Sequence, residues 1–171
     1  MWGTNSALEA RAATLELGFI DLASDWTSQE THKVLLAPNQ STEVVSRLPV
    51  AHPPIHDSDP AVTASHSVVV WARLLDIKTG EVLARYSDWP QPYRVLDLPD
   101  PEVTIRIEAD TVCVDVTRPV KGLVLSTAGD EEPQWEDNNL DMIPGDKRRI
   151  KAVGLNGRIV RVAYLGKERA Q

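Results

Sequence analysis

Apolar and polar residues alternate along most of this 171-residue chain, with the period of two that is typical of half-buried β-strands. In the run TLELGFIDLAS, Leu15, Leu17 and Phe19 alternate with polar or small residues. The run HKVLLAPNQSTEVVS supplies two further apolar segments around a turn signal at Pro38 and Asn39. We therefore predict strands in TLELGFIDLAS and on both sides of this turn.

A longer apolar run, SHSVVVWARLLDIKTGEVLARYSDW, predicts a strand, a turn at Lys78-Thr79-Gly80 and a returning strand. The proline-rich stretch PVAHPPIHDSDP, residues 49–60, lies before it. Because proline lacks the N–H that a central strand or a helix interior needs, we interpret this stretch as a long surface loop. A second proline cluster, WPQPYRVLDLPDP, marks the expected domain boundary, since prolines make stiff connectors with few ladder bonds.

The second half of the chain has a clearer strand pattern. The run EVTIRIEADTVCVDV predicts a hairpin that turns near Ala109-Asp110. Its apolar face is expected to carry Val103, Ile105, Ile107, Val112, Val114 and Val116. With VKGLVLST, residues 140–142, RRIKAV and RIVRVAYL, this half contains about six or seven short strands, as in a small immunoglobulin-like sandwich.

No convincing helical period is present, so the predicted fold class is all-β, with two tandem immunoglobulin-like β-sandwiches. We expect the first sandwich at residues 1–90 and the second at 102–171. The proline-rich linker between them is expected at 91–101.

The segment QWEDNNLDMIPGDKRRIKAVGL contains a turn between two strands. Pro144 presets φ for the second position of a tight turn, and Gly145 accepts the positive φ that a type II turn needs next. Beyond the turn, Ile150 and Ala152 alternate with lysine and arginine. We interpret the whole as a hairpin, and the basic run DKRRIK as one face of its second strand.

The net charge of -7 argues against a phosphate-binding surface, so we expect no nucleic-acid partner. No apolar run approaches the roughly 18 to 20 residues that cross a bilayer, so no membrane partner is expected. Cys113 is the only cysteine, which excludes an intrachain disulfide and a cysteine-rich metal framework. Its position in TVCVDV favours a buried or half-buried thiol over a nucleophile.

Two groups of residues have the composition of a metal site. His52, His56 and His66 lie in or beside the first proline-rich stretch. A His-x3-His spacing aligns two rings only on a helix, which Pro53 and Pro54 forbid, so we expect solvated loop histidines. The acidic stretch GDEEPQWED lacks the order of ligands and the central glycine of a calcium loop. We therefore predict no metal site and no cofactor.

Carboxylates and tryptophans are the remaining candidates for chemistry. Glycoside cleavage needs two carboxyl groups held in one pocket, whereas Glu102, Glu108 and Asp115 are expected on outward strand faces. Five tryptophans allow a sugar-stacking platform. The positions of Trp71 in a strand, and of Trp89 and Trp135 next to prolines, favour core packing or wedging between domains. We expect all five indoles to be buried or at domain seams.

Asn39-Gln40-Ser41 matches the N-glycosylation acceptor pattern and lies in a predicted turn. This match matters only if the protein is secreted.

With the strands assigned, residues 135–146, WEDNNLDMIPGD, resemble the W-S-D-N-x-F-D-L-x-P-G-E segment in the last immunoglobulin-like domain of β-mannosidases of glycoside hydrolase family 2. WGTNS, RLLDIKTGEVLARYSDWPQPY and RPVKGLVLST are similar to further segments of these enzymes. The resemblance covers essentially the whole chain and fits the fungal B-type group best. Leu140 replaces the usual aromatic residue and Met142 a common leucine, which puts the fine packing in doubt more than the fold.

The resemblance implies a parent protein with a sugar-binding-like jelly roll, an immunoglobulin-like domain, a (β/α)8 barrel with two catalytic glutamates, and two C-terminal sandwiches. This chain then corresponds to the C-terminal pair. It is expected to brace the barrel of a retaining exo-β-mannosidase, with the catalytic barrel and N-terminal domains as its partners. Both catalytic glutamates lie outside the chain, so no catalytic residue is assigned and the chain alone is predicted to be inactive.

Two other functions stay open: a carbohydrate-binding module, and the C-terminal region of a related family 2 exo-glucosaminidase. The β-mannoside substrate is expected for the parent only. The B-type resemblance favours an intracellular location, and a secreted location also stays open.

Overall fold

The computed structural model describes residues 1–47, 49–51, 67–128 and 131–167. Within these ranges the chain forms strands β1–β13 and one 3₁₀ turn, η2 (Tyr93–Val95), which confirms the all-β fold class. No helix in the described ranges is long and apolar enough to cross a membrane. The chain divides into two compact units, Met1–Leu96 and Asp97–Gln171, and this division falls inside the stretch 91–101 predicted as a linker.

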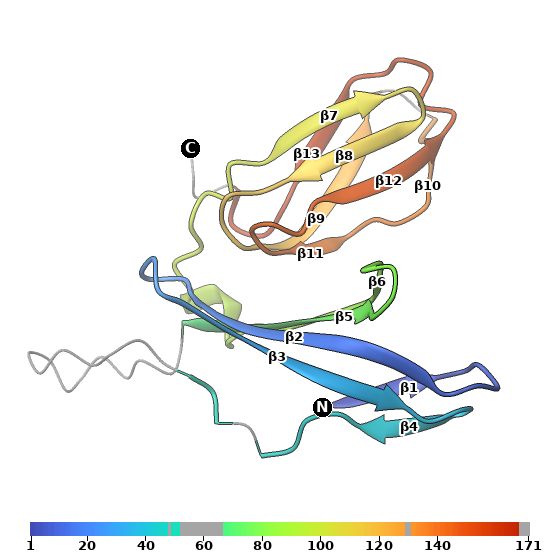
Figure 1. Ribbon diagram of the computed structural model, residues 1–171. Helices are drawn as coiled ribbons and strands as arrows, with labels where there is room; N and C mark the ends of the chain where they lie inside the picture. Colours follow the sequence, from blue (N-terminus) through green and yellow to red (C-terminus); the bar gives the residue numbers. More distant parts are fainter. Residues whose placement is uncertain (48, 52–66, 129–130, 168–171) are drawn as a thin grey trace, which may run out of the picture. The chain divides into compact units, whose positions relative to one another are not determined.

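The first unit, Met1–Leu96, contains a four-stranded antiparallel sheet with the order β3-β2-β5-β6 and a two-stranded ribbon of β1 and β4 (Figure 1). Its strands are β1 (Trp2–Asn5), β2 (Arg11–Asp21), β3 (Thr27–Leu36), β4 (Gln40–Glu43), β5 (Val68–Asp76) and β6 (Val82–Asp88). The predicted turns at Asn39 and Gly80 are confirmed, since both residues have positive φ, 47° and 71°. Residues 49–51 of the predicted loop have no regular structure, and the remainder, residues 52–60, lies outside the described residues.

The sheet of the first unit buries apolar side chains on both of its faces. On one face, Leu15, Leu17 and Phe19 of β2 pack with β5 residues, and the end of the ribbon covers them through Met1 and Val45. On the other face, Val69 and Trp71 of β5 are 0% and 6% exposed. Gly18 of β2 pairs with Trp71 and leaves room for its indole. The two-sided burial explains why the alternation in β2 includes a glycine where a polar residue is usual.

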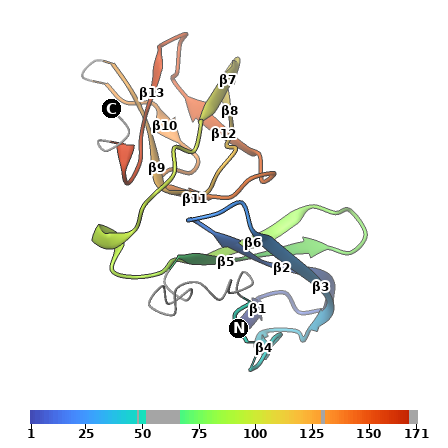
Figure 2. The ribbon, with the colours of Figure 1, turned by 90° about the vertical axis from the view of Figure 1, so that its left-hand side faces the viewer.

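The second unit, Asp97–Gln171, is a sandwich of two antiparallel sheets, with the orders β10-β12-β8-β7 and β11-β9-β13 (Figure 2). Its strands are β7 (Thr104–Glu108), β8 (Thr111–Asp115), β9 (Val120–Thr127), β10 (Gln134–Trp135), β11 (Leu140–Met142), β12 (Arg148–Val153) and β13 (Val160–Ala163). The core between the sheets consists of apolar residues from both, including Val112, Val114, Leu123, Leu125 and Ile150. The alternation in the sequence predicted the inward side of β8 and β12 correctly.

Ile107 is an exception to the predicted apolar face of the second unit. It pairs with Val112, which is 0% exposed, yet Ile107 itself is 42% exposed. The reason is its position in β7, the edge strand of its sheet. A strand pattern predicts which face a side chain lies on, but not how far the opposite sheet extends over it.

The turn at Gly145 is confirmed, but the hairpin predicted around it is wrong. Gly145 has φ 80°, and the N–H of Asp146 donates to the carbonyl of Ile143 over 3.2 Å, as in a type II turn. However, β11 pairs with β9, whereas β12 pairs with β8 and β10. The turn thus leads the chain from one sheet to the other. Type II turns splay their flanking strands, which disfavours direct pairing across them.

Candidate functional site

The metal candidates from the sequence give no site in the described part of the chain. His52, His56 and His66 lie outside the described residues. In the acidic stretch, both carboxylate oxygens of Glu132 accept the backbone N–H of Thr127 over 3.1 Å, so this acid holds the end of β9. Within the described ranges, no group of three or more His, Cys, Asp or Glu side chains gathers as metal ligands would.

The outward acids form ion pairs with the basic run. Glu108 lies 3.0 Å from Arg149, and Asp115 lies 2.9 Å from Lys147. The hydrogen bond from Arg149, together with other nearby positive charge, lowers the pKa of Glu108. Glu102 is exposed, as predicted. These carboxylates are on a solvated surface and lack the enclosure that an acid catalyst needs.

Cys113 is half-buried, as the sequence predicted. It lies between Val112 and Val114 in β8 and therefore points away from the core that these two valines enter. A guanidinium nitrogen of Arg149 lies 3.2 Å from its sulfur. The thiol thus forms part of the same outward polar ladder as the ion pairs.

The segment that carries the family resemblance stabilises β9 through side-chain contacts with its backbone. Asn138 accepts the N–H of Leu125 over 2.8 Å and donates to its carbonyl over 2.9 Å, so its amide replaces a partner strand. Asp141 accepts the N–H of Gly122 over 2.9 Å and pairs with Lys121 over 2.8 Å. Leu125 is 1% exposed, and a buried backbone group without a partner is costly. These polar residues are explained by the fold.

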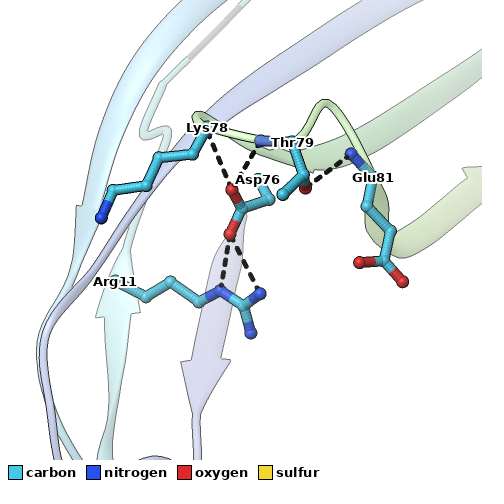
Figure 3. A network of polar contacts seen from close by, with 5 residues as sticks. All are labelled: Arg11, Asp76, Lys78, Thr79 and Glu81. Atoms are coloured by element: carbon cyan, nitrogen blue, oxygen red, sulfur yellow. Dashed lines mark hydrogen bonds and ion pairs between the residues drawn. The ribbon is translucent and has the colours of Figure 1, made fainter.

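A second polar cluster closes the β5–β6 hairpin in the first unit (Figure 3). One oxygen of Asp76 accepts the backbone N–H groups of Lys78 and Thr79 over 2.8 and 3.1 Å. The other oxygen accepts from Arg11 on β2 over 3.0 Å. The two backbone hydrogen bonds, and then Arg11, lower the pKa of Asp76 to about 2. The carboxylate thus links β2, β5 and the turn between β5 and β6 at one end of the sheet.

Four tryptophans are packed, and one is not. Trp71 and Trp89 are buried, while Trp26 and Trp135 are half-buried against the cores of their units. Trp2 is 66% exposed, so it is not buried within its unit, and its place at a seam with another domain stays a prediction. Trp2 lies in β1, a strand of only four residues, which is too short for its inward and outward sides to be assigned from the sequence.

The exposed indole belongs to a polar face of the β1–β4 ribbon. Trp2 pairs directly with Glu43, and Thr4 pairs with Ser41. Directly opposed residues in an antiparallel pair share a face, and all four are exposed. The hydroxyls of Thr4 and Ser41 lie 2.9 Å apart. The opposite face of the ribbon includes Gly3, where an added Cβ would lie 3.0 Å from Leu36 of β3, so that face is the inward one.

A groove of about 510 Å³ lies at the end of the ribbon. Its lining consists of Met1, Leu17, Phe19, Glu43, Val45, Ser46, Arg47, Val50 and Val70. The lining thus combines apolar side chains with the carboxylate of Glu43 and the guanidinium of Arg47. Its volume is within the range of ligand-binding pockets. Glu43 belongs both to this lining and to the exposed face that carries Trp2.

The comparisons with known proteins show the family of this chain. Residues 1–94 match the family described as "Mannosidase Ig/CBM-like domain". The chain belongs to this family. Its similarity to curated members extends past residue 94: it is 28% identical to Beta-mannosidase B of Neosartorya fischeri over 163 residues, 91% of this chain. It is 32% identical to Beta-mannosidase B of Thermothelomyces thermophilus over 163 residues, 92% of this chain.

The chain spans 18% of the length of both of these relatives. Among solved structures, the exo-chitosanase CsxA of Amycolatopsis orientalis has a similar fold, with a TM-score of 0.60 and 14% identity. The similarity covers 95% of this chain and 24% of that one. The resemblance of the sequence to the immunoglobulin-like region of B-type β-mannosidases is thus confirmed.

Proposed function

We propose that this chain is the non-catalytic C-terminal region of a retaining exo-acting β-mannosidase and that it braces the catalytic domains of the same parent protein. The observation that carries the proposal is the similarity of almost the whole chain to proteins named Beta-mannosidase B, of whose length it spans 18%. In the parent, two glutamates outside this chain remove terminal β-linked mannose through a glycosyl-enzyme intermediate.

The ionisation of the acids supports a bracing role. A glycosidase needs a carboxylic acid that stays protonated near neutral pH, and that requires a raised pKa. In the described residues, the carboxyl groups with shifted pKa values are Asp21, Asp76 and Glu108, and all three are lowered. Burial raises the pKa of Asp21, but hydrogen bonds from Ser24, Ser67 and the Ala23 N–H outweigh it. These three carboxylates therefore serve to accept hydrogen bonds from backbone N–H groups, hydroxyls and arginine side chains.

The test compares the chain with its parent. The purified 171-residue chain and the full-length parent are assayed with an aryl β-mannoside at matched concentration, after a circular dichroism spectrum has shown that the chain is folded. We expect turnover by the parent and none by the chain, and we expect a parent that lacks this region to unfold at a lower temperature. Turnover by the chain that disappears when one of its own carboxylates is replaced would overturn the proposal.

The second candidate is an exo-glucosaminidase parent, which the similarity to the fold of the exo-chitosanase supports. At 14% identity that similarity concerns the fold alone. An aryl β-glucosaminide assayed in parallel separates the two, because a single exo-acting site discriminates between a 2-hydroxyl and a 2-amino group on the sugar. Turnover of the glucosaminide alone would replace the mannosidase assignment.

We also propose an intracellular location, on the basis of the B-type resemblance. Asn39 offers a simple test, because it is exposed in the β3–β4 turn and begins an N-glycosylation acceptor pattern. In a secreted protein its side chain would be open to glycan transfer. We expect no change in gel mobility when the protein from its native source is treated with an endoglycosidase. A mobility shift that the Asn39→Gln variant lacks would contradict the intracellular location.

A further inference from the structure

The exposed face of the β1–β4 ribbon has the composition of a sugar-binding surface. Trp2 presents an indole that is 66% exposed, next to its cross-strand partner Glu43. Among the contacts of the described residues, neither the indole N–H nor this carboxylate has a hydrogen-bond partner. Thr4 and Ser41, one pair further along the ribbon, add two hydroxyls that are also exposed. The face therefore combines one exposed indole with a carboxylate and with two exposed hydroxyls that bond to each other.

A pyranose ring complements each of these groups. Its C–H face is apolar and weakly positive, so it packs on the negative face of an indole. Its hydroxyls donate well to a carboxylate, which only accepts, and they exchange hydrogen bonds in both directions with serine and threonine. Neighbouring positions in an antiparallel pair are about 5 Å apart and diagonal ones about 7–8 Å. A sugar stacked on Trp2 is thus within reach of Glu43, Thr4 and Ser41.

Other occupants fit this face less well. A stable protein interface needs a well-packed apolar centre, whereas Trp2 is the one large apolar side chain among these four residues. A phosphate-bearing ligand would meet the negative charge of Glu43. The groove adds room for a longer ligand, since Glu43 also lines it together with Ser46 and Arg47.

We propose that the ribbon face formed by Trp2, Thr4, Ser41 and Glu43 binds a β-linked manno-oligosaccharide outside the catalytic centre, with Trp2 as the stacking surface. The choice of sugar rests on the proposed function of the parent. A single stacked ring with a few exposed hydrogen bonds gives a weak site, with a dissociation constant on the order of 1 mM. Such a site holds a substrate chain near the enzyme and contributes little to binding of a single sugar.

The first experiment titrates the 171-residue chain with β-1,4-mannohexaose and follows the five indole N–H signals by NMR. The Trp2 signal is assigned as the one lost in Trp2→Phe. We expect this signal to shift saturably while those of Trp71 and Trp89 stay in place, because the latter two are buried. Trp2→Ala should weaken binding at least tenfold and Glu43→Gln several-fold. Neither change should lower the thermal midpoint, since both side chains are exposed.

The matched control is Tyr86→Ala, which removes another exposed aromatic ring from the same unit, on β6. We expect this variant to bind mannohexaose like the unchanged chain. A Trp2 signal that does not shift, or an equal loss in Tyr86→Ala, would overturn the inference. Glucosamine hexamer is titrated in parallel, and saturable binding of that sugar in place of mannohexaose would overturn the assignment to β-mannosides.

A second experiment uses the full-length parent, in which other domains adjoin this region. Trp2→Ala should raise KM for mannohexaose several-fold and leave KM and kcat for an aryl β-mannoside unchanged. Equal KM values for mannohexaose in the unchanged parent and in its Trp2→Ala variant would contradict the inference. The ribbon face would then be covered by another domain or would not bind the substrate in the parent. An active parent with such equal values leaves the proposed function intact, whereas a parent inactive on β-mannosides removes the proposed function itself.

Discussion

Gly18 lies so close to Trp71 that a Cβ on Gly18 would be 2.3 Å from Cε2 of the indole. The ring is held in place, because the Arg73 guanidinium lies 5.1 Å from its centroid and also binds Glu16 over 2.8 Å. Glycine is needed at this position for space, since the neighbouring strand pairs directly across it. The indole of Trp71 thus occupies the space that a side chain at position 18 would need on this face of the sheet.

We expect Gly18→Ala to lower the free energy of unfolding by about 1–3 kcal/mol, the usual cost of overpacking a fitted site. Urea denaturation followed by circular dichroism measures the change. The same substitution in a Trp71→Leu background should cost clearly less, because the clash is then absent. Equal costs in the two backgrounds would show that the indole does not occupy the space above Gly18.

Asn138→Ala should destabilise the second unit by about 1–3 kcal/mol, because it leaves the buried N–H and carbonyl of Leu125 without partners. Asn138→Asp should also destabilise it, since a carboxylate cannot donate to that carbonyl. The neighbouring Asn139→Gly is the control, because Asn139 has φ 61°, which glycine adopts without strain. Thermal unfolding ranks the three variants, and a tolerated Asn138→Ala would remove the backbone-holding role of this segment.

Gly145→Val should lower the urea midpoint, at a cost of about 1–3 kcal/mol, because a β-branched residue is strained at the φ of 80° found here. Asparagine tolerates this region better, so Gly145→Asn should cost less. Beyond its two chain neighbours, no atom lies within 4 Å of the position of an added Cβ, so the difference between the two variants reports backbone conformation. An unchanged midpoint in Gly145→Val would contradict the type II turn.

The lowered pKa of Asp76 predicts a loss of stability in acid. Its pKa is about 2 in the folded protein, below the value of about 4 for an unfolded chain. The stabilisation is therefore complete above about pH 4 and disappears as the pH falls through about 2. Asp76→Asn keeps an oxygen for the turn but loses the charge. The stability difference between the two proteins, measured from pH 6 down to pH 2, should shrink across this window, and a constant difference would contradict the role of ionisation.

The second unit has a core of its own and should fold without the first. We expect a protein of residues 97–171 to give a β-type circular dichroism spectrum and a cooperative urea transition. Ile150→Ala is the reference change, because this side chain is 1% exposed and its loss should cost about 2–5 kcal/mol. A noncooperative transition in the unsubstituted protein would mean that the two units fold only together.

Local signals in the sequence predicted local structure well. The alternation in β12 predicted that Ile150 and Ala152 are buried, and Pro144-Gly145 predicted the type II turn. The pairing of β11 was missed because a turn residue fixes only a few dihedral angles, while the choice of partner strand depends on the opposite sheet. Local patterns in the sequence therefore predicted the strands and the turns, but they did not predict which strands pair.

For the residues of the candidate sites, local features were likewise predicted and contacts with distant segments were not. The segment around Asn138 was recognised by its similarity to a family, but its role depends on the backbone of β9, thirteen positions away in the chain. The exposure of Trp2 within its unit was not predicted because four residues do not establish a period, and composition favours packing for any tryptophan. Both cases depend on contacts between distant segments, for which a single sequence gives little information.

The side chains that bind along β9 also affect the behaviour of the protein at high concentration. β11 pairs with β9 only between Val120 and Leu123, and beyond that point Asn138 and Glu132 bind the amides of Leu125 and Thr127. An open row of such amides attracts a strand from another molecule, which is how edge strands start to aggregate. Asn138 and Glu132 therefore occupy amides of β9 that another strand would otherwise bind. Replacing both should promote fibrous aggregates that grow while most of the protein is still folded.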